Sequence, residues 1–147
     1  MQNAEAAELL QKGLLALENG HSYLAMTCLE QASRLESTPR LNSWLAYCHA
    51  LNGRDIDMAI ELAKKALHDD STNPEYCHNL GRIFLLSGRK EEAIFIFRQG
   101  LADSLHPELI ACLEQLGTRK PPAFKDLSRN HPFNKYAGKL LRILGKR

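Results

Sequence analysis

The sequence of 147 residues lacks any uninterrupted apolar run of about eighteen residues, the length that a transmembrane helix requires. Aromatic residues make up only 7% of the chain, against 44% hydrophobic and 24% charged residues. This balance argues against a disordered chain and against an aromatic-rich β sandwich, and it favours a single helical domain or a short array of repeats. The first five residues lack the basic stretch and apolar core of a secretory signal, so we expect a cytoplasmic protein.

Cysteine is scarce, and no C-x-x-C pair is present. The four cysteines stand singly and far apart, at Cys28, Cys48, Cys77 and Cys112. Such spacing supports neither a disulfide framework nor a zinc site, so we expect reduced, buried thiols that behave as small hydrophobic residues.

Motifs of catalysis are also missing. The sequence contains no G-x4-G-K-[ST] phosphate loop, no G-x-S-x-G elbow and no H-E-x-x-H metal helix. The adjacent pairs Cys48-His49 and Cys77-His78 would point about 100° apart on a helix, so neither converges on one ion. We therefore expect a protein that is not an enzyme and has no metal or cofactor, and we expect His49 to be a hydrogen-bonded core residue.

Small residues, by contrast, recur at steps of 34 residues in two series. The first series is Ala25, Ala59 and Ala93, and the second is Ala32, Ala66 and Gly100. Self-similarity at this period indicates stacked helical hairpins. Apolar residues at three- and four-residue steps agree with helices, and the sequence predicts no strand.

Glycine and proline mark the expected ends of these helices. Gly20, Gly53 and Gly88 fall in the turns before second helices, where a left-handed backbone is needed. Prolines at the first helical position follow Thr38 and Asn73, which are good caps, and His106, which is a poor one. The predicted helices cover about 4–18, 22–36, 40–51, 55–68, 74–86, 90–103 and 107–116.

These features resemble the tetratricopeptide repeat family, whose units carry W-x2-L-G-x2-Y in the first helix and A-x3-F-x2-A in the second. The third unit carries Leu80-Gly81-Arg82-Ile83-Phe84, then Ala93 and Phe97. The first unit keeps Gly13 at the position of Gly81. The middle unit has a turn one residue longer, and we place its Ala46 at this small-residue position of the first helix. The resemblance implies an all-α, right-handed superhelical solenoid over residues 1–117, with repeats at about 6–39, 40–73 and 74–107 and a capping helix at 107–116.

The resemblance further implies an adaptor or scaffold that binds a peptide or helix of another protein in a concave groove. By analogy with the family, the groove residues are Gln11, Leu14, Glu18, Trp44, Tyr47, Leu51, Asn79, Arg82 and Leu86. Trp44 and Tyr47 are the strongest candidates for affinity, although Trp44 could equally fill a gap between repeats. Arg82 could hold a partner carboxylate or could be a solvated charge.

One subtype of the family grips the acidic C-termini of heat-shock chaperones with Lys, Asn and Arg. The matching positions here are Leu10, Leu14, Trp44, Glu75 and Asn79. None of them keeps the required residue type, so that carboxylate grip is not expected. A more apolar and aromatic groove favours an amphipathic or partly hydrophobic segment.

The last thirty residues differ in charge from the rest. Residues 1–117 hold ten Lys and Arg against sixteen Asp and Glu, a net charge of −6, whereas residues 118–147 hold nine against one, a net charge of +8. Prolines predict an extended segment at 118–132, followed by a basic amphipathic helix from Lys135 to about Gly145. Its basic face comprises Lys135, Lys139, Arg142 and Lys146.

Three roles are open for this tail, which is similar to those of small bacterial tetratricopeptide proteins. The helix could cap the end of the solenoid. It could bind an anionic membrane or nucleic acid, which would make the chain a surface-recruitment protein. Alternatively, residues 118–132 could occupy the groove of a second copy and form a homo-oligomer.

Overall fold

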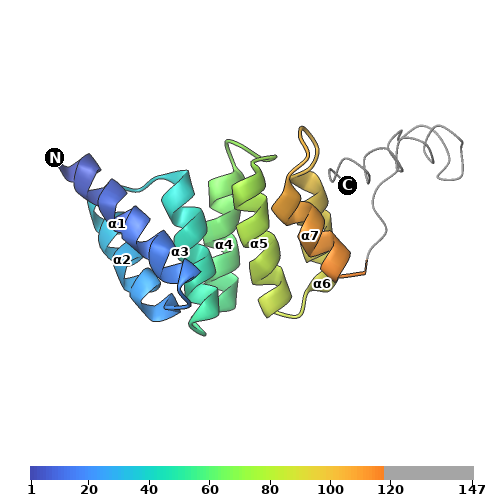
Figure 1. Ribbon diagram of the computed structural model, residues 1–147, viewed down its shortest axis with the longest axis horizontal. Helices are drawn as coiled ribbons and strands as arrows, with labels where there is room; N and C mark the ends of the chain where they lie inside the picture. The colour runs from blue at the N-terminus through green and yellow to red at the C-terminus, as the bar shows by residue number, and fades with distance from the viewer. Residues whose placement is uncertain (118–147) are drawn as a thin grey trace, which may run out of the picture.

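The computed structural model of the chain describes residues 1–117, which form seven α-helices and no β-strand (Figure 1). The helices are α1 (Gln2–Glu18), α2 (Ser22–Leu35), α3 (Pro39–Leu51), α4 (Ile56–Leu67), α5 (Pro74–Leu86), α6 (Lys90–Gln99) and α7 (Pro107–Gln115). Successive hairpins α1/α2, α3/α4 and α5/α6 stack in chain order, and α7 packs on α5 and α6. The all-α, right-handed superhelical solenoid predicted from the repeat is confirmed.

Local signals in the sequence set the helix ends. The side chain of Thr38 accepts a hydrogen bond from the backbone N–H of Leu41 at 3.2 Å, and Asn73 accepts one from Tyr76 at 3.1 Å. His106, the predicted poor cap, makes no such bond. The turn glycines Gly20, Gly53 and Gly88 have φ of 78°, 69° and 75°, a conformation that a side chain would strain.

The end of α6 differs from the prediction, whereas the turn between α3 and α4 agrees with it. The expected end of the sixth helix near residue 103 is wrong, because α6 stops at Gln99. The backbone N–H groups of Leu101 and Ala102 bond to carbonyls three residues back, which tightens the chain and ends the α-helix. The turn between α3 and α4 has the extra residue predicted for the middle unit, and Ala46 is fully buried, as its assigned small position requires.

Two apolar clusters fill the solenoid, and α3 contributes to both. Leu41, Leu45 and Cys48 of α3 join α1 and α2 in an N-terminal cluster, whereas Ala46 and Ala50 join α4 to α7 in a larger C-terminal cluster. Since each hairpin covers the apolar face of the next, no unit could bury its core alone. Helix α3 therefore determines how the first unit is joined to the others.

Two expectations about single residues are corrected. Cys48 and Cys77 are buried, but Cys28 and Cys112 are only half-buried, and all four thiols are free. His49 is half-buried rather than in the core, because its Nε2 lies 3.3 Å from Glu30 Oε1 near the surface.

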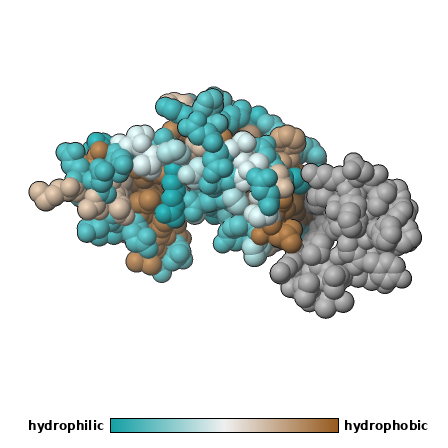
Figure 2. Space-filling view, turned by 90° about the horizontal axis from the view of Figure 1, so that it is seen from above, coloured by the Kyte–Doolittle hydropathy of each residue, from teal (hydrophilic) through white to brown (hydrophobic). Residues whose placement is uncertain are grey.

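The face of the molecule that Figure 2 shows is mostly hydrophilic, with separate apolar patches. Within residues 1–117, every helix is too short or too polar to cross a bilayer.

Candidate peptide-binding groove

The first helices of the three units border a hollow of about 680 Å³, which also reaches the start of α7. We call this hollow the groove. Six of the nine predicted groove residues line it: Leu14, Glu18, Trp44, Tyr47, Leu51 and Arg82. Helix α3 packs against α5, whereas α1 and α3 make few contacts with each other. The residues that line the groove come from all three units and from α7.

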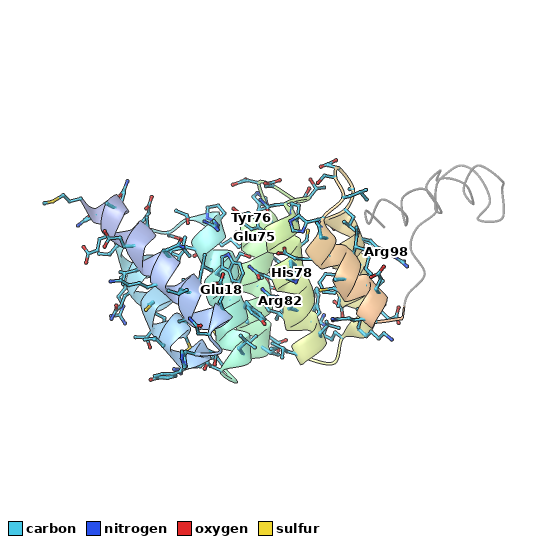
Figure 3. The ribbon with its side chains drawn as sticks, in the orientation of Figure 1. Glu18, Glu75, Tyr76, His78, Arg82 and Arg98 are labelled. Carbon is cyan, nitrogen blue, oxygen red and sulfur yellow. The ribbon has the colours of Figure 1, made fainter. Side chains whose placement is uncertain are left out.

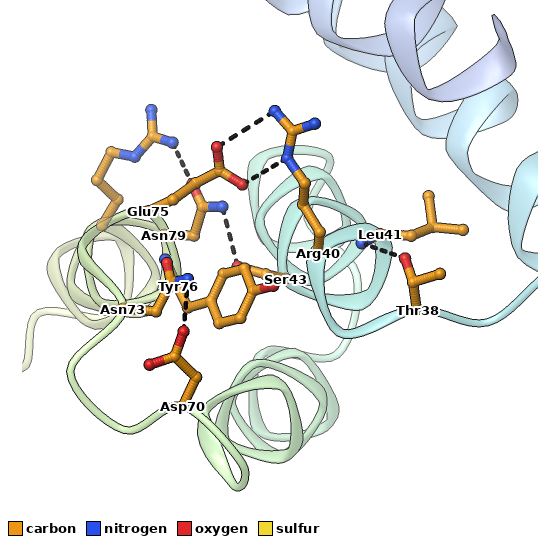
Figure 4. A network of polar contacts seen from close by, with 10 residues as sticks. Thr38, Arg40, Leu41, Ser43, Asp70, Asn73, Glu75, Tyr76 and Asn79 are labelled. Carbon is orange, nitrogen blue, oxygen red and sulfur yellow. Dashed lines mark hydrogen bonds and ion pairs between the residues drawn. The ribbon is translucent and has the colours of Figure 1, made fainter. Parts of the chain in front are cut away.

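The other three predicted residues lie elsewhere. Gln11 is exposed on α1, and Leu86 is 50% exposed at the end of α5, and neither lines the groove. Asn79 does not face the groove as predicted, because it is fully buried between α5 and α3. Its Nδ2 donates a hydrogen bond of 3.0 Å to Ser43 Oγ, which is also fully buried (Figure 4).

Arg82 stacks on the aromatic residues of α3. Its guanidinium carbon lies 3.7 Å from the centre of the Tyr47 ring and 5.5 Å from that of Trp44, and the two rings meet edge to face at 6.4 Å. Its Nη2 donates to Asn79 Oδ1. Burial lowers the pKa of Arg82, although the group stays protonated at neutral pH. Arg82 is therefore not a freely solvated charge.

Trp44 lies both against the core and in the groove. Its ring is half-buried and packs against the N-terminal cluster, and it also lines the groove. The indole Nε1, Arg82 Nε and His106 Nδ1 are buried and have no hydrogen-bond partner, and all three residues line the groove. The described residues leave no other buried side-chain nitrogen or oxygen in this state.

The groove also contains a row of charged residues, of which the sequence analysis had considered only Glu75. Arg40, Glu75 and Glu108 line the groove, and each directly follows the proline that begins its helix. Arg40 Nε lies 2.8 Å and Nη2 3.3 Å from the two carboxylate oxygens of Glu75, in a forked pair that joins α3 to α5 (Figure 4). The shared position after proline was the signal that could have identified this row.

His78 is a further groove residue that the sequence did not single out for binding. It lies on α5 between Glu75 and Arg82 (Figure 3). Burial, together with the nearby Arg82 and His106, lowers the pKa of His78 to about 4. Its imidazole is therefore neutral at physiological pH and does not add to the positive charge of Arg82.

The predicted basic face of the tail, Lys135, Lys139, Arg142 and Lys146, lies outside the described residues, as does the predicted extended segment. Among residues 1–117, no group of three or more His, Cys, Asp or Glu side chains is placed to hold a metal ion.

Comparisons with known proteins agree with this architecture. Residues 74–102 match the tetratricopeptide repeat family. The crystal structure of the yeast Tom70 is similar to this chain at 18% sequence identity with a TM-score of 0.55, covering 92% of this chain and 33% of that one. This chain thus spans about a third of the length of the Tom70 chain, and at this identity the likeness concerns the fold. No curated protein sequence matches. Residues 74–102 of the third unit thus match the tetratricopeptide repeat family, and the described residues have the fold of an array of such repeats.

Proposed function

We propose that this protein is a non-catalytic adaptor that binds a peptide or helical segment of another protein in the groove. The observation that carries the proposal is the hollow of about 680 Å³ bordered by successive first helices, with Trp44 and Tyr47 among its lining residues. A hollow of this size accommodates a few side chains of an inserted segment rather than a folded domain.

The chemistry of the lining supports an amphipathic partner. Leu14, Leu17 and Leu51 provide apolar surface beside the two aromatic rings. Large, rigid aromatic side chains give much contact area for little loss of conformational entropy, and they dominate the energetics of many interfaces. A helix that lays one apolar face into the groove would use this surface in the manner of other helix-in-groove complexes.

Two polar groups of the groove, Ser22 and Glu75, are held in structural contacts. Ser22, a hydroxyl group in the lining, donates to the amide oxygen of Asn52 at 3.2 Å and not to a general base. Glu75 is held by Arg40. Each of these groups is thus engaged in structural contacts that leave it poorly placed to act as a nucleophile or base.

Site-specific photo-crosslinking tests the proposal. A benzophenone amino acid replaces Leu51 in the groove or, as a matched apolar control, Met58, which is 70% exposed on α4 and does not line the groove. We expect the Leu51 position to capture a protein from native lysate, and Trp44→Ala to reduce this capture about tenfold, the effect of removing a moderate hot spot.

Circular dichroism melts of each variant verify that the array stays folded. Equal capture from both positions, or capture that Trp44→Ala leaves unchanged, would show that the partner binds outside the groove.

A further inference from the structure

Arg82 carries a positive charge in the groove without a carboxylate partner. Within the described residues, its guanidinium forms no ion pair with an Asp or Glu side chain, and its one hydrogen bond goes to the neutral amide of Asn79. Glu108 is near enough to raise the pKa of Arg82 but does not pair with it. Arg40, by contrast, is fully engaged with Glu75. Of the two arginines of the groove, only Arg82 thus lacks a carboxylate partner among the described residues.

The groove also contains hydrogen-bond donors without acceptors, which likewise favours an anionic ligand. Of the five N–H groups of Arg82, the one on Nε is buried without an acceptor, and so is the indole N–H of Trp44. A buried donor without a partner is unfavourable, so a ligand that supplies oxygen acceptors at this point gains from satisfying it. A carboxylate matches the planar guanidinium better than any other protein group.

The surrounding charges limit the ligand to few negative groups. Glu18, Glu75 and Glu108 line the groove with only two cations, Arg40 and Arg82. A strongly acidic segment would meet these carboxylates and be repelled, whereas one carboxylate placed at Arg82 finds an unpaired cation. The chemistry therefore differs from that of a polyacidic tail.

We propose that the partner segment presents a single Asp or Glu side chain to Arg82 and places its neighbouring apolar side chains against Leu14, Leu17 and Leu51. The groove continues on both sides of Arg82, toward α1 and toward His106 of α7. A segment that passes over Arg82 fills both halves, whereas a chain end would leave one half empty. The carboxylate is therefore assigned to an internal side chain. This inference rests on the proposed function.

Three pools of short peptides, of about twelve residues so that they span roughly three helical turns, test it. All pools carry randomised Leu, Ile, Met or Phe at helical spacing. The first pool has Glu at its centre and blocked ends. The second has Gln there instead, and the third has Gln with a free C-terminal carboxylate. Each pool is passed over the immobilised full-length protein, and the retained peptides are quantified by mass spectrometry.

We expect the wild-type protein to retain the Glu pool about tenfold better than either Gln pool, the gain of one charge-assisted hydrogen-bonded pair. Arg82→Gln should abolish this preference. Arg54→Gln, which removes an arginine exposed in the turn between α3 and α4, should leave it intact. Arg82→Lys keeps the charge without the fork and should retain only part of the preference, which covers the case in which Arg82→Gln fails to fold.

Retention of all pools without a Glu preference, or a Glu preference that survives Arg82→Gln, would overturn the inference while the proposed function stands. Better retention of the free-carboxylate pool would also overturn it. Retention of no pool, or retention that Trp44→Ala does not reduce, would overturn both the inference and the groove-binding function.

Discussion

The side-chain amide of Asn79 connects the core to the groove through Ser43 on one side and Arg82 on the other. Its Nδ2 lies 3.0 Å from Ser43 Oγ on α3, and its Oδ1 accepts from Arg82 Nη2 one turn along α5. Asn79 and Ser43 are both fully buried. Asn79 therefore satisfies the buried hydroxyl of Ser43 between two units and also holds Arg82, a cation that lines the groove.

Replacing Asn79 should destabilise the fold more than replacing Ser43. Asn79→Leu leaves Ser43 Oγ and one Arg82 N–H without a partner, at a cost of about 1–3 kcal/mol in the free energy of unfolding. In Ser43→Ala the amide keeps its bond to Arg82, so we expect the smaller loss. Urea denaturation followed by circular dichroism measures both. If both variants were as stable as the wild type, the hydrogen bonds of Asn79 would not contribute to the stability of the fold.

The repeat itself was predictable because packing imposes it locally. Ala25, Ala59 and Ala93 are at most 1% exposed, since each lies where two helices of a hairpin approach closely. A small residue at this point recurs with every unit, so the period of 34 residues is visible in the sequence alone.

The contents of the groove were less predictable. The analogy placed Asn79 in the groove, but its surroundings depend on Ser43, which is 36 residues away on another helix. Likewise, nothing local to Arg82 indicates that its guanidinium stacks on Tyr47. Burial between units is decided by pairs of residues that are distant in the sequence, and a single sequence carries no signal of such pairs.

Gly81→Ala should be more harmful than Gly13→Ala, although both glycines occupy the same position in their units. An added Cβ at Gly81 would overlap the ring of Phe97, which is fully buried and cannot move aside. At Gly13 the overlap is smaller, because the nearest atoms are Cδ2 and Cγ of the buried Leu29, both at 2.9 Å, whereas the nearest ring atom at Gly81 is closer still. We expect Gly81→Ala to lose about 1–3 kcal/mol of unfolding free energy, as overpacked cores do, and Gly13→Ala to lose less.

Thermal melts compare the two variants, and Phe97→Leu provides the control for the mechanism. In the Gly81→Ala background, Phe97→Leu should cost less than it does in the wild type, because it also relieves the overlap. If the losses of unfolding free energy in the two single variants simply added up in the double variant, the overlap between residues 81 and 97 would not be the cause of the destabilisation.

Stability should depend on pH through His78. Its pKa in the folded state is about 4, below the unfolded value of about 6.5, so the unfolded chain binds the extra proton between these values. Unfolding free energy should therefore fall as pH drops from about 6.5 toward 4, by about 1–2 kcal/mol after allowance for solvent screening. Urea titrations at several pH values measure this slope.

His78→Gln removes the titrating group and should flatten the slope over that window. His68→Gln, at an exposed histidine in the loop after α4, is the matched control and should keep the wild-type slope. A slope that His78→Gln does not change would assign the pH dependence to other groups.

The four thiols should react in an order set by burial and pKa, because alkylation requires an accessible thiolate. Burial raises the pKa of Cys48 and of Cys77 to about 12, and it also raises the pKa of the half-buried Cys112. A short iodoacetamide pulse at pH 8, read out by mass spectrometry, should label the half-buried Cys28 first, Cys112 more slowly, and the other two only through unfolding. In denaturant all four should react at similar rates, and native labelling of Cys77 as fast as that of Cys28 would contradict the packing of α5 against α6 and α7.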